Sequence, residues 1–131
     1  MTQMMHFADW VEHLAILYRD QCAGIFIVSD IESAGYCYQS KSFTGPDVPQ
    51  IFEVGQLVEH LKSSGINFNW QKFDYVEEMS TGHLILGNEQ ETLVCKLDQD
   101  LQVIVGVTVS ILKKGIAQEI SDVIIQMLSE E

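Results

Sequence analysis

Histidines and carboxylates are the side chains here that could do acid–base or metal chemistry, and their spacing favours neither. The four histidines are His6, His13, His60 and His83. His6 and His13 are seven residues apart, which puts them near one face of a helix but about two turns from each other. A metal ion in a protein site needs three or four ligands within about 2.3 Å. We therefore expect no metal site.

Two acidic pairs, Glu77–Glu78 and Glu89/Glu91, are the remaining candidates for acid–base catalysis. Neighbouring residues of a strand point to opposite faces of a sheet, whereas a general acid and a general base must converge on one cleft. We interpret these residues as solvated charges that protect sheet edges from unwanted pairing.

Motifs that hold phosphates, cofactors or nucleophiles are missing from the sequence. It contains no G-x-S-x-G, H-E-x-x-H, Walker loop or G-x-G-x-x-G. The segment 82–87 has two glycines but lacks the Gly-Lys-Ser/Thr that grips phosphate. We expect no catalytic residue and no cofactor, and we predict a protein that is not an enzyme and works through its surfaces.

The charge balance narrows the class of partner. Nineteen acidic residues face seven basic ones, a net charge of -12, and such a surface repels nucleic-acid phosphates and anionic lipids. We therefore expect no nucleic-acid partner and no membrane insertion. The acidity fits either simple solubility or a basic partner.

The cysteines and the N-terminus predict a cytoplasmic, reduced protein. Cys22, Cys37 and Cys95 form no CxxC, and Cys37 and Cys95 lie in strand-like segments where they fit as small buried residues. No signal peptide is visible, and no apolar run reaches the ~20 residues of a membrane span.

Hydrophobic periodicity predicts a single α+β domain over residues 1–131, a normal domain length. We expect helices over residues 4–19, 49–63 and 111–129. We expect strands over residues 25–28, 36–42, 73–79, 83–87, 92–97 and 101–110. One of the last four strands could instead be an extended loop, so the predicted sheet is antiparallel with about five strands, in the order αββαβββα. Gly35 is expected to take positive φ in a turn, and Pro49 to lie in the first turn of the middle helix.

The middle helix carries its apolar stripe at Ile51, Val54, Val58 and Leu61. Gly55 interrupts this helix and is less favourable than alanine by up to ~1 kcal/mol. Two explanations stay open: simple tolerance, or close approach of another helix.

This order of elements resembles the roadblock family, which is named for a dynein light chain and has a profilin-like arrangement. The resemblance rests on the apolar segment 23–30 (Ala-Gly-Ile-Phe-Ile-Val-Ser-Asp), which enters a turn before a glycine, here Gly35. The segment 81–86 (Thr-Gly-His-Leu-Ile-Leu) is similar to a second strand of the family.

The resemblance implies a homodimer joined through the second helix and the adjacent strand. The interface candidates it implies are Ile51, Val54, Gly55, Val58 and Glu59. It also implies a small Ras-like GTPase as partner, bound by a surface, and a scaffold or regulator without catalytic residues.

Two other functional classes fit the sequence. An acidic secretion-type chaperone would share the size, the charge and a dimerising α/β sheet, although such chaperones usually place three strands before the middle helix. A small-molecule sensor domain would instead line a pocket with aromatic residues: Trp10, Tyr36, Tyr38, Trp70 and Phe73.

Overall fold

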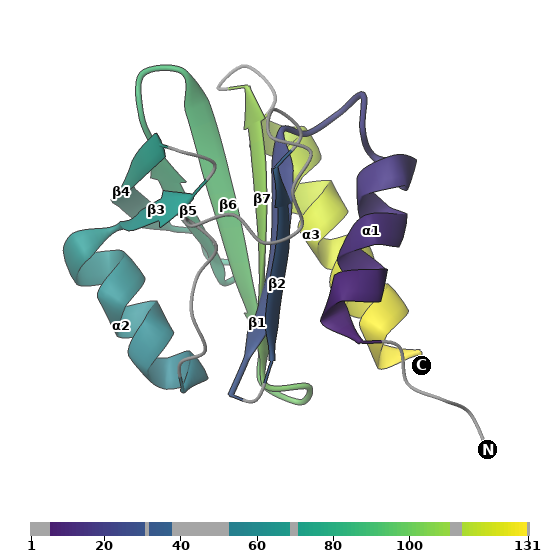
Figure 1. Ribbon diagram of the computed structural model, residues 1–131. Coiled ribbons are helices and arrows are strands. Elements are labelled where there is room, and N and C mark those ends of the chain that lie inside the picture. The colour runs from purple at the N-terminus through teal and green to yellow at the C-terminus, as the bar shows by residue number, and fades with distance from the viewer. Residues whose placement is uncertain (1–5, 31, 38–52, 69–70, 111–113, 131) are drawn as a thin grey trace.

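Seven antiparallel strands make one curled sheet in this computed structural model, and three helices cover its two faces (Figure 1). The structure describes residues 6–30, 32–37, 53–68, 71–110 and 114–130. The helices are α1 (Phe7–Leu17), α2 (Val54–Ser64) and α3 (Lys114–Ser129). The strands are β1 (Gly24–Ser29), β2 (Ser33–Cys37), β3 (Ile66–Phe68), β4 (Gln71–Glu78), β5 (His83–Gly87), β6 (Glu91–Asp98) and β7 (Val103–Ser110). Their order across the sheet is β2-β1-β7-β6-β5-β4-β3.

The prediction of an α+β chain with three helices and an antiparallel sheet is confirmed, but the predicted number of about five strands is wrong. All four strand candidates after α2 are present, and β3 precedes them, so five strands separate α2 from α3 in the described part of the chain. At three residues, β3 is too short to give a periodic signal. It forms because Gly65 ends α2 and Ile66 then pairs with Phe73 of β4.

Two predicted turn features are also wrong. Gly35 does not take positive φ; it lies inside β2 opposite Phe26, because β2 already begins at Ser33. Helix α2 begins at Val54, since Glu53 before it has an extended backbone with φ -62° and ψ 133°. The predicted start of this helix at residue 49 is therefore wrong, and Pro49 itself lies outside the described residues.

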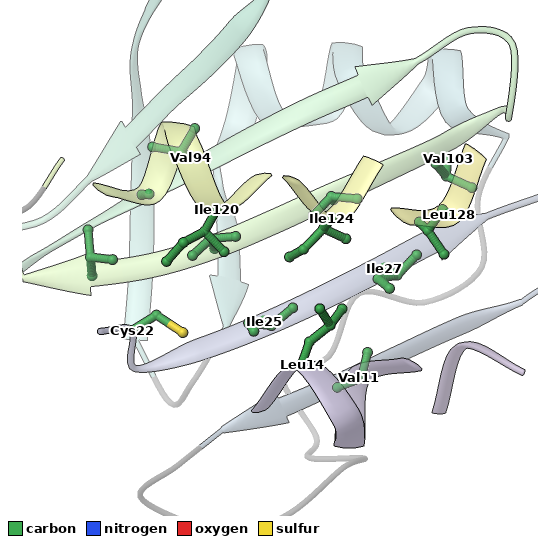
Figure 2. Close-up of a cluster of buried hydrophobic side chains, with 14 of the residues drawn as sticks. Val11, Leu14, Cys22, Ile25, Ile27, Val94, Val103, Ile120, Ile124 and Leu128 are labelled. Atoms are coloured by element: carbon green, nitrogen blue, oxygen red, sulfur yellow. The ribbon is translucent and has the colours of Figure 1, made fainter. Parts of the chain in front are cut away.

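Helices α1 and α3 lie together on one face of the sheet (Figure 1). Figure 2 shows Val11 and Leu14 of α1 beside Ile25 and Ile27 of β1. Three buried residues of α3 at helical spacing pack on the same face: Ile120, Ile124 and Leu128. Every residue of β1 is buried, so this strand is covered on both faces of the sheet.

Helix α2 covers the opposite face. Its inward residues Val54, Leu57 and Leu61 join a second hydrophobic cluster. The rings of Phe26 and Phe68 meet edge to face there, 5.0 Å apart at 78°, a favoured aromatic geometry.

The β1–β2 turn anchors a helix on each side of the sheet. Asp30 Oδ1 accepts a hydrogen bond from the Val54 N–H at 3.0 Å. Glu32 Oε1 accepts one from the Phe7 N–H at 2.7 Å. Both N–H groups belong to first helical turns, which have no partner within their own helix. One short turn thus fixes where α1 and α2 begin.

No helix within the described residues is both long enough and apolar enough to cross a membrane.

Candidate functional site

The four interface candidates that the structure describes divide between the inside and the outside of α2. Val54 is 6% exposed and belongs to the hydrophobic cluster under the helix. Val58 is half-buried against the same cluster, whereas Gly55 and Glu59 are exposed. Ile51 falls outside the described residues. Of the interface candidates, Gly55 and Glu59 therefore lie on the exposed strip of α2, one turn apart.

Space around Gly55 is open. A Cβ atom built on Gly55 meets nothing within 4 Å. The contrast is Gly106, where a Cβ would lie 2.2 Å from the ring of Phe26. Packing among the described residues therefore requires a glycine at position 106 but not at position 55.

An ion pair ties the C-terminal turn of α2 to β4. Lys62 Nζ lies 2.8 Å from Glu78 Oε1, and the hydrogen bond that Lys62 donates to Glu78 raises the pKa of Lys62. Glu78 is opposite Leu84 and Glu77 is opposite Ile85 in the sheet, so the two acids point to opposite faces. Both side chains are exposed, as expected for solvated charges, but Glu78 is paired with Lys62.

The second acidic pair is also divided. Glu89 is exposed beside the β5–β6 turn, whereas Glu91 Oε2 accepts a hydrogen bond from Gln71 Nε2 at 2.7 Å. Asn88 donates to Gln71 Oε1 at 2.9 Å and accepts from the Glu91 N–H at 2.8 Å. This network holds the β5–β6 turn against β4. The other oxygen of Glu91, Oε1, is buried without a hydrogen-bond partner.

The structure brings together one polar cluster that the sequence did not indicate. Thr81 Oγ1 lies 2.6 Å from His83 Nδ1, and His83 Nε2 lies 2.8 Å from Asp122 Oδ1. The His83 side chain is buried, while Asp122 is 56% exposed on α3. Asp122 is 39 residues from His83 along the chain, so only the packing of α3 on the sheet joins them.

The cluster ties the β4–β5 turn to α3, and we call it the Thr81–His83–Asp122 clamp. With the proton on Nε2, His83 donates to Asp122 and accepts from the Thr81 hydroxyl, so both ring nitrogens are satisfied. A hydroxyl, an imidazole and a carboxylate in a row can also activate a nucleophile. Lys96 Nζ of β6 also donates to the backbone carbonyl of Thr81, which fixes the same turn from the neighbouring strand. We assign the cluster to holding the β4–β5 turn against α3.

The remaining histidines stay apart. His6 lies 3.6 Å from Glu32, and His13 meets the edge of Trp10 with ring centroids 6.5 Å apart. His60 is exposed on α2, on the other face of the sheet. In the described part of the chain, no group of three or more His, Cys, Asp or Glu residues is placed to hold a metal ion.

The aromatic residues considered for a sensor pocket do not share one. Trp10 and Tyr36 pack on the cluster under α1 and α3, whereas Phe73 is fully buried in the cluster under α2. Tyr38 and Trp70 lie outside the described residues. The sheet separates the two groups, so the described aromatic residues act as core.

Cys95 behaves as predicted for a small buried residue. It lies under α2 with no exposed surface, and burial raises the pKa of its thiol well above the ordinary value of 9.0. Cys22 is also buried with a free thiol. The side chain of Cys37 is outside the described set.

Comparison with known proteins adds no relative: no protein-family model matches this chain, and no curated protein matches it significantly.

Proposed function

We propose that this chain is a non-enzymatic, dimeric scaffold or regulator of a small Ras-like GTPase, acting through protein–protein surfaces. The observation that carries the proposal is the open space at Gly55 on the outside of α2. Gly55 is the exposed second residue of α2, and no packing contact among the described residues requires a glycine there. A second helix approaching from outside would supply the reason, because small residues let helix axes come close.

The dimer we propose has twofold symmetry, with α2 of each protomer against its twin. Gly55 lies at the point of contact and Glu59 one turn further on. Val58, half-exposed beside them, adds apolar area, and Val54 holds the helix to the sheet from inside. Ile51 completes the proposed interface.

The adjacent strand suits the same symmetry. Strand β3 follows α2 directly and forms one edge of the sheet, and an edge strand is a template for pairing with another chain. Because β3 has only three residues, it can form few hydrogen bonds with a partner strand. In this proposal the pair of α2 helices therefore provides most of the contact.

The GTPase partner rests on the resemblance in element order to the roadblock family. The competing classes have less support. The described aromatic residues of a sensor pocket lie on opposite faces of the sheet. A secretion-type chaperone usually has three strands before its middle helix, and the described part of this chain has two.

The dimer can be tested with one variant and a matched control. Gly55→Arg places a bulky charge at the proposed contact, and Gly115→Arg makes the same change on α3, where a Cβ also meets nothing within 4 Å. We expect sedimentation equilibrium to give a dimer for the wild type and for Gly115→Arg, and a folded monomer for Gly55→Arg. A monomeric wild type, or a Gly55→Arg variant that remains dimeric, would contradict the interface.

The partner needs a separate experiment. The purified chain, immobilised, is used for affinity capture from native lysate loaded with GDP or with a non-hydrolysable GTP analogue, followed by mass spectrometry. We expect to recover a Ras-like GTPase in one of the two nucleotide states. The same GTPase, once purified, should bind the chain again. If no GTPase is recovered in either state, the proposed GTPase partner is refuted. The proposed dimer is not affected, because sedimentation equilibrium tests it separately.

A further inference from the structure

The sheet face that carries α1 and α3 is not covered over its whole width. Helix α1 packs on β1 and β2, and α3 packs on β6 and β7. Beyond α3, three residues of β4 on this face are exposed to solvent: Asp74, Val76 and Glu77. An open hollow of about 460 Å³ lies there, which we call the β4–β5 hollow. Its lining includes Val76, Ile85, Gly87, Asn88, Glu89 and Thr92.

A β-bulge shapes this hollow. Tyr75 is opposite Leu86 and Glu77 is opposite Ile85, so Val76 has no cross-strand partner on β5. A bulge of this kind turns side chains away from the regular alternation. Here it leaves Val76 at the hollow with 59% of its surface exposed, beside the buried side chain of Ile85.

The rim of the hollow is acidic. Glu89 lines it, and Asp74 lies directly opposite Gly87, a residue of its floor. Glu77 lies opposite Ile85, and the half-exposed carboxylate of Asp122 stands at the His83 end of the same strand. Two described lysines near these strands already have backbone partners: Lys96 donates to the Thr81 carbonyl and Lys72 of β4 donates to the Ser64 carbonyl.

We propose that the β4–β5 hollow binds a basic, extended segment of a partner protein, one apolar side chain of which rests on Val76 and Ile85. Lysine or arginine residues on either side of that anchor meet Asp74, Glu77 and Glu89. Complementary charge selects the partner and speeds its approach, while the apolar floor supplies the area removed from water. This site lies on the opposite face of the sheet from the outer strip of α2, so it does not depend on the proposed dimer.

Binding can be measured by fluorescence anisotropy with a labelled nine-residue peptide of alternating lysine and leucine. The informative variant is Val76→Glu, because it removes the apolar anchor and adds a negative charge. If the peptide binds in the hollow, Val76→Glu should bind it roughly tenfold more weakly than the wild type does. If the peptide is only attracted to an acidic protein, the added charge should make the variant bind it more tightly. The matched control is Val123→Glu, since Val123 is 38% exposed and lies about 100° around α3 from Asp122. We expect the control to bind no more weakly than the wild type.

A second pair of variants tests the rim. Glu89→Gln should weaken binding about two- to fivefold, the range of one exposed ion pair. Glu12→Gln, which removes an exposed acid of α1 on another surface, should change it less. A peptide with glutamate in place of every lysine should not bind.

Three results would overturn the proposal: equal or tighter peptide binding by Val76→Glu, equal binding of the glutamate peptide, or self-association that Val76→Glu abolishes. The last result would assign the hollow to a second copy of this chain. Circular dichroism of each variant confirms that the fold is retained.

Discussion

Replacing Gly106 with alanine is the sharpest test of how the sheet packs under α2. Gly106 of β7 lies opposite Phe26 of β1. A Cβ at this position would lie 2.2 Å from two carbon atoms of the Phe26 ring, whereas carbon atoms in contact normally lie about 3.5–4.0 Å apart. The ring must therefore retreat by at least about 1 Å.

The room for that movement is small. Phe26 has no exposed surface and packs edge to face against Phe68. Overpacking a core costs about 1–3 kcal/mol, and alanine recovers about 0.5–1 kcal/mol of the entropy that a glycine loses in a strand. We expect Gly106→Ala to lower the free energy of unfolding by about 1–2 kcal/mol.

Urea unfolding followed by circular dichroism measures the effect. Gly115→Ala is the matched control, because a Cβ there meets nothing within 4 Å, and it should leave stability unchanged or raise it by up to ~1 kcal/mol. In a Phe26→Leu background the ring is gone, so Gly106→Ala should cost markedly less. An undiminished loss in that background, or no loss in the wild type, would refute the contact with Phe26 as the cause.

Three further perturbations test the α2 face. Leu61→Asp buries a charge in a site with no exposed surface and should destabilise the chain by at least about 3 kcal/mol; an unchanged thermal melt would show that α2 is misplaced. Asp30→Ala removes the acceptor for the Val54 N–H and should cost about 0.5–2 kcal/mol in urea unfolding, while Asp30→Asn keeps an oxygen acceptor and should cost less. Because burial raises the pKa of the Cys95 thiol above its ordinary 9.0, only the unfolded chain releases this proton, so stability falls as pH rises above 9.0. Between pH 8 and pH 10 the free energy of unfolding should therefore decrease by about 1.4 kcal/mol less in Cys95→Val than in the wild type. Equal decreases in the two proteins would contradict the burial of a protonated thiol.

Local sequence patterns located most of the elements. The stripe on α1, the continuous apolar run of β1 and the three strands before α3 carry their own periodicity, so their type could be predicted without knowing what they touch. The boundary between β6 and β7 has a local cause too, because the turn residues Asp98, Gln99 and Asp100 lie there. Strand β3 was missed because three residues form a strand only through pairing with β4.

Side-chain placement on α2 was only partly predictable. Periodicity put Val54, Val58 and Leu61 on one stripe, and the structure buries Val54 and Leu61 while leaving Val58 half-buried. The start of the helix was misjudged because its first N–H group is capped from a distant turn, by Asp30. No local signal at Pro49 or Val54 reveals a cap that lies 24 residues earlier.

By itself the sequence determined the α+β class, the three helices, the buried β1 strand and the strong negative charge, because each depends on composition or on contacts within a few residues. Only the tertiary structure decided the seven-stranded order, the Thr81–His83–Asp122 clamp, the requirement for glycine opposite Phe26, and the acidic hollow beside the β4 bulge. These features join residues that are tens of positions apart. Their geometry depends on strand register and helix packing, which are set by the free energy of the whole chain. Such long-range contacts produce no hydrophobic periodicity within any one segment.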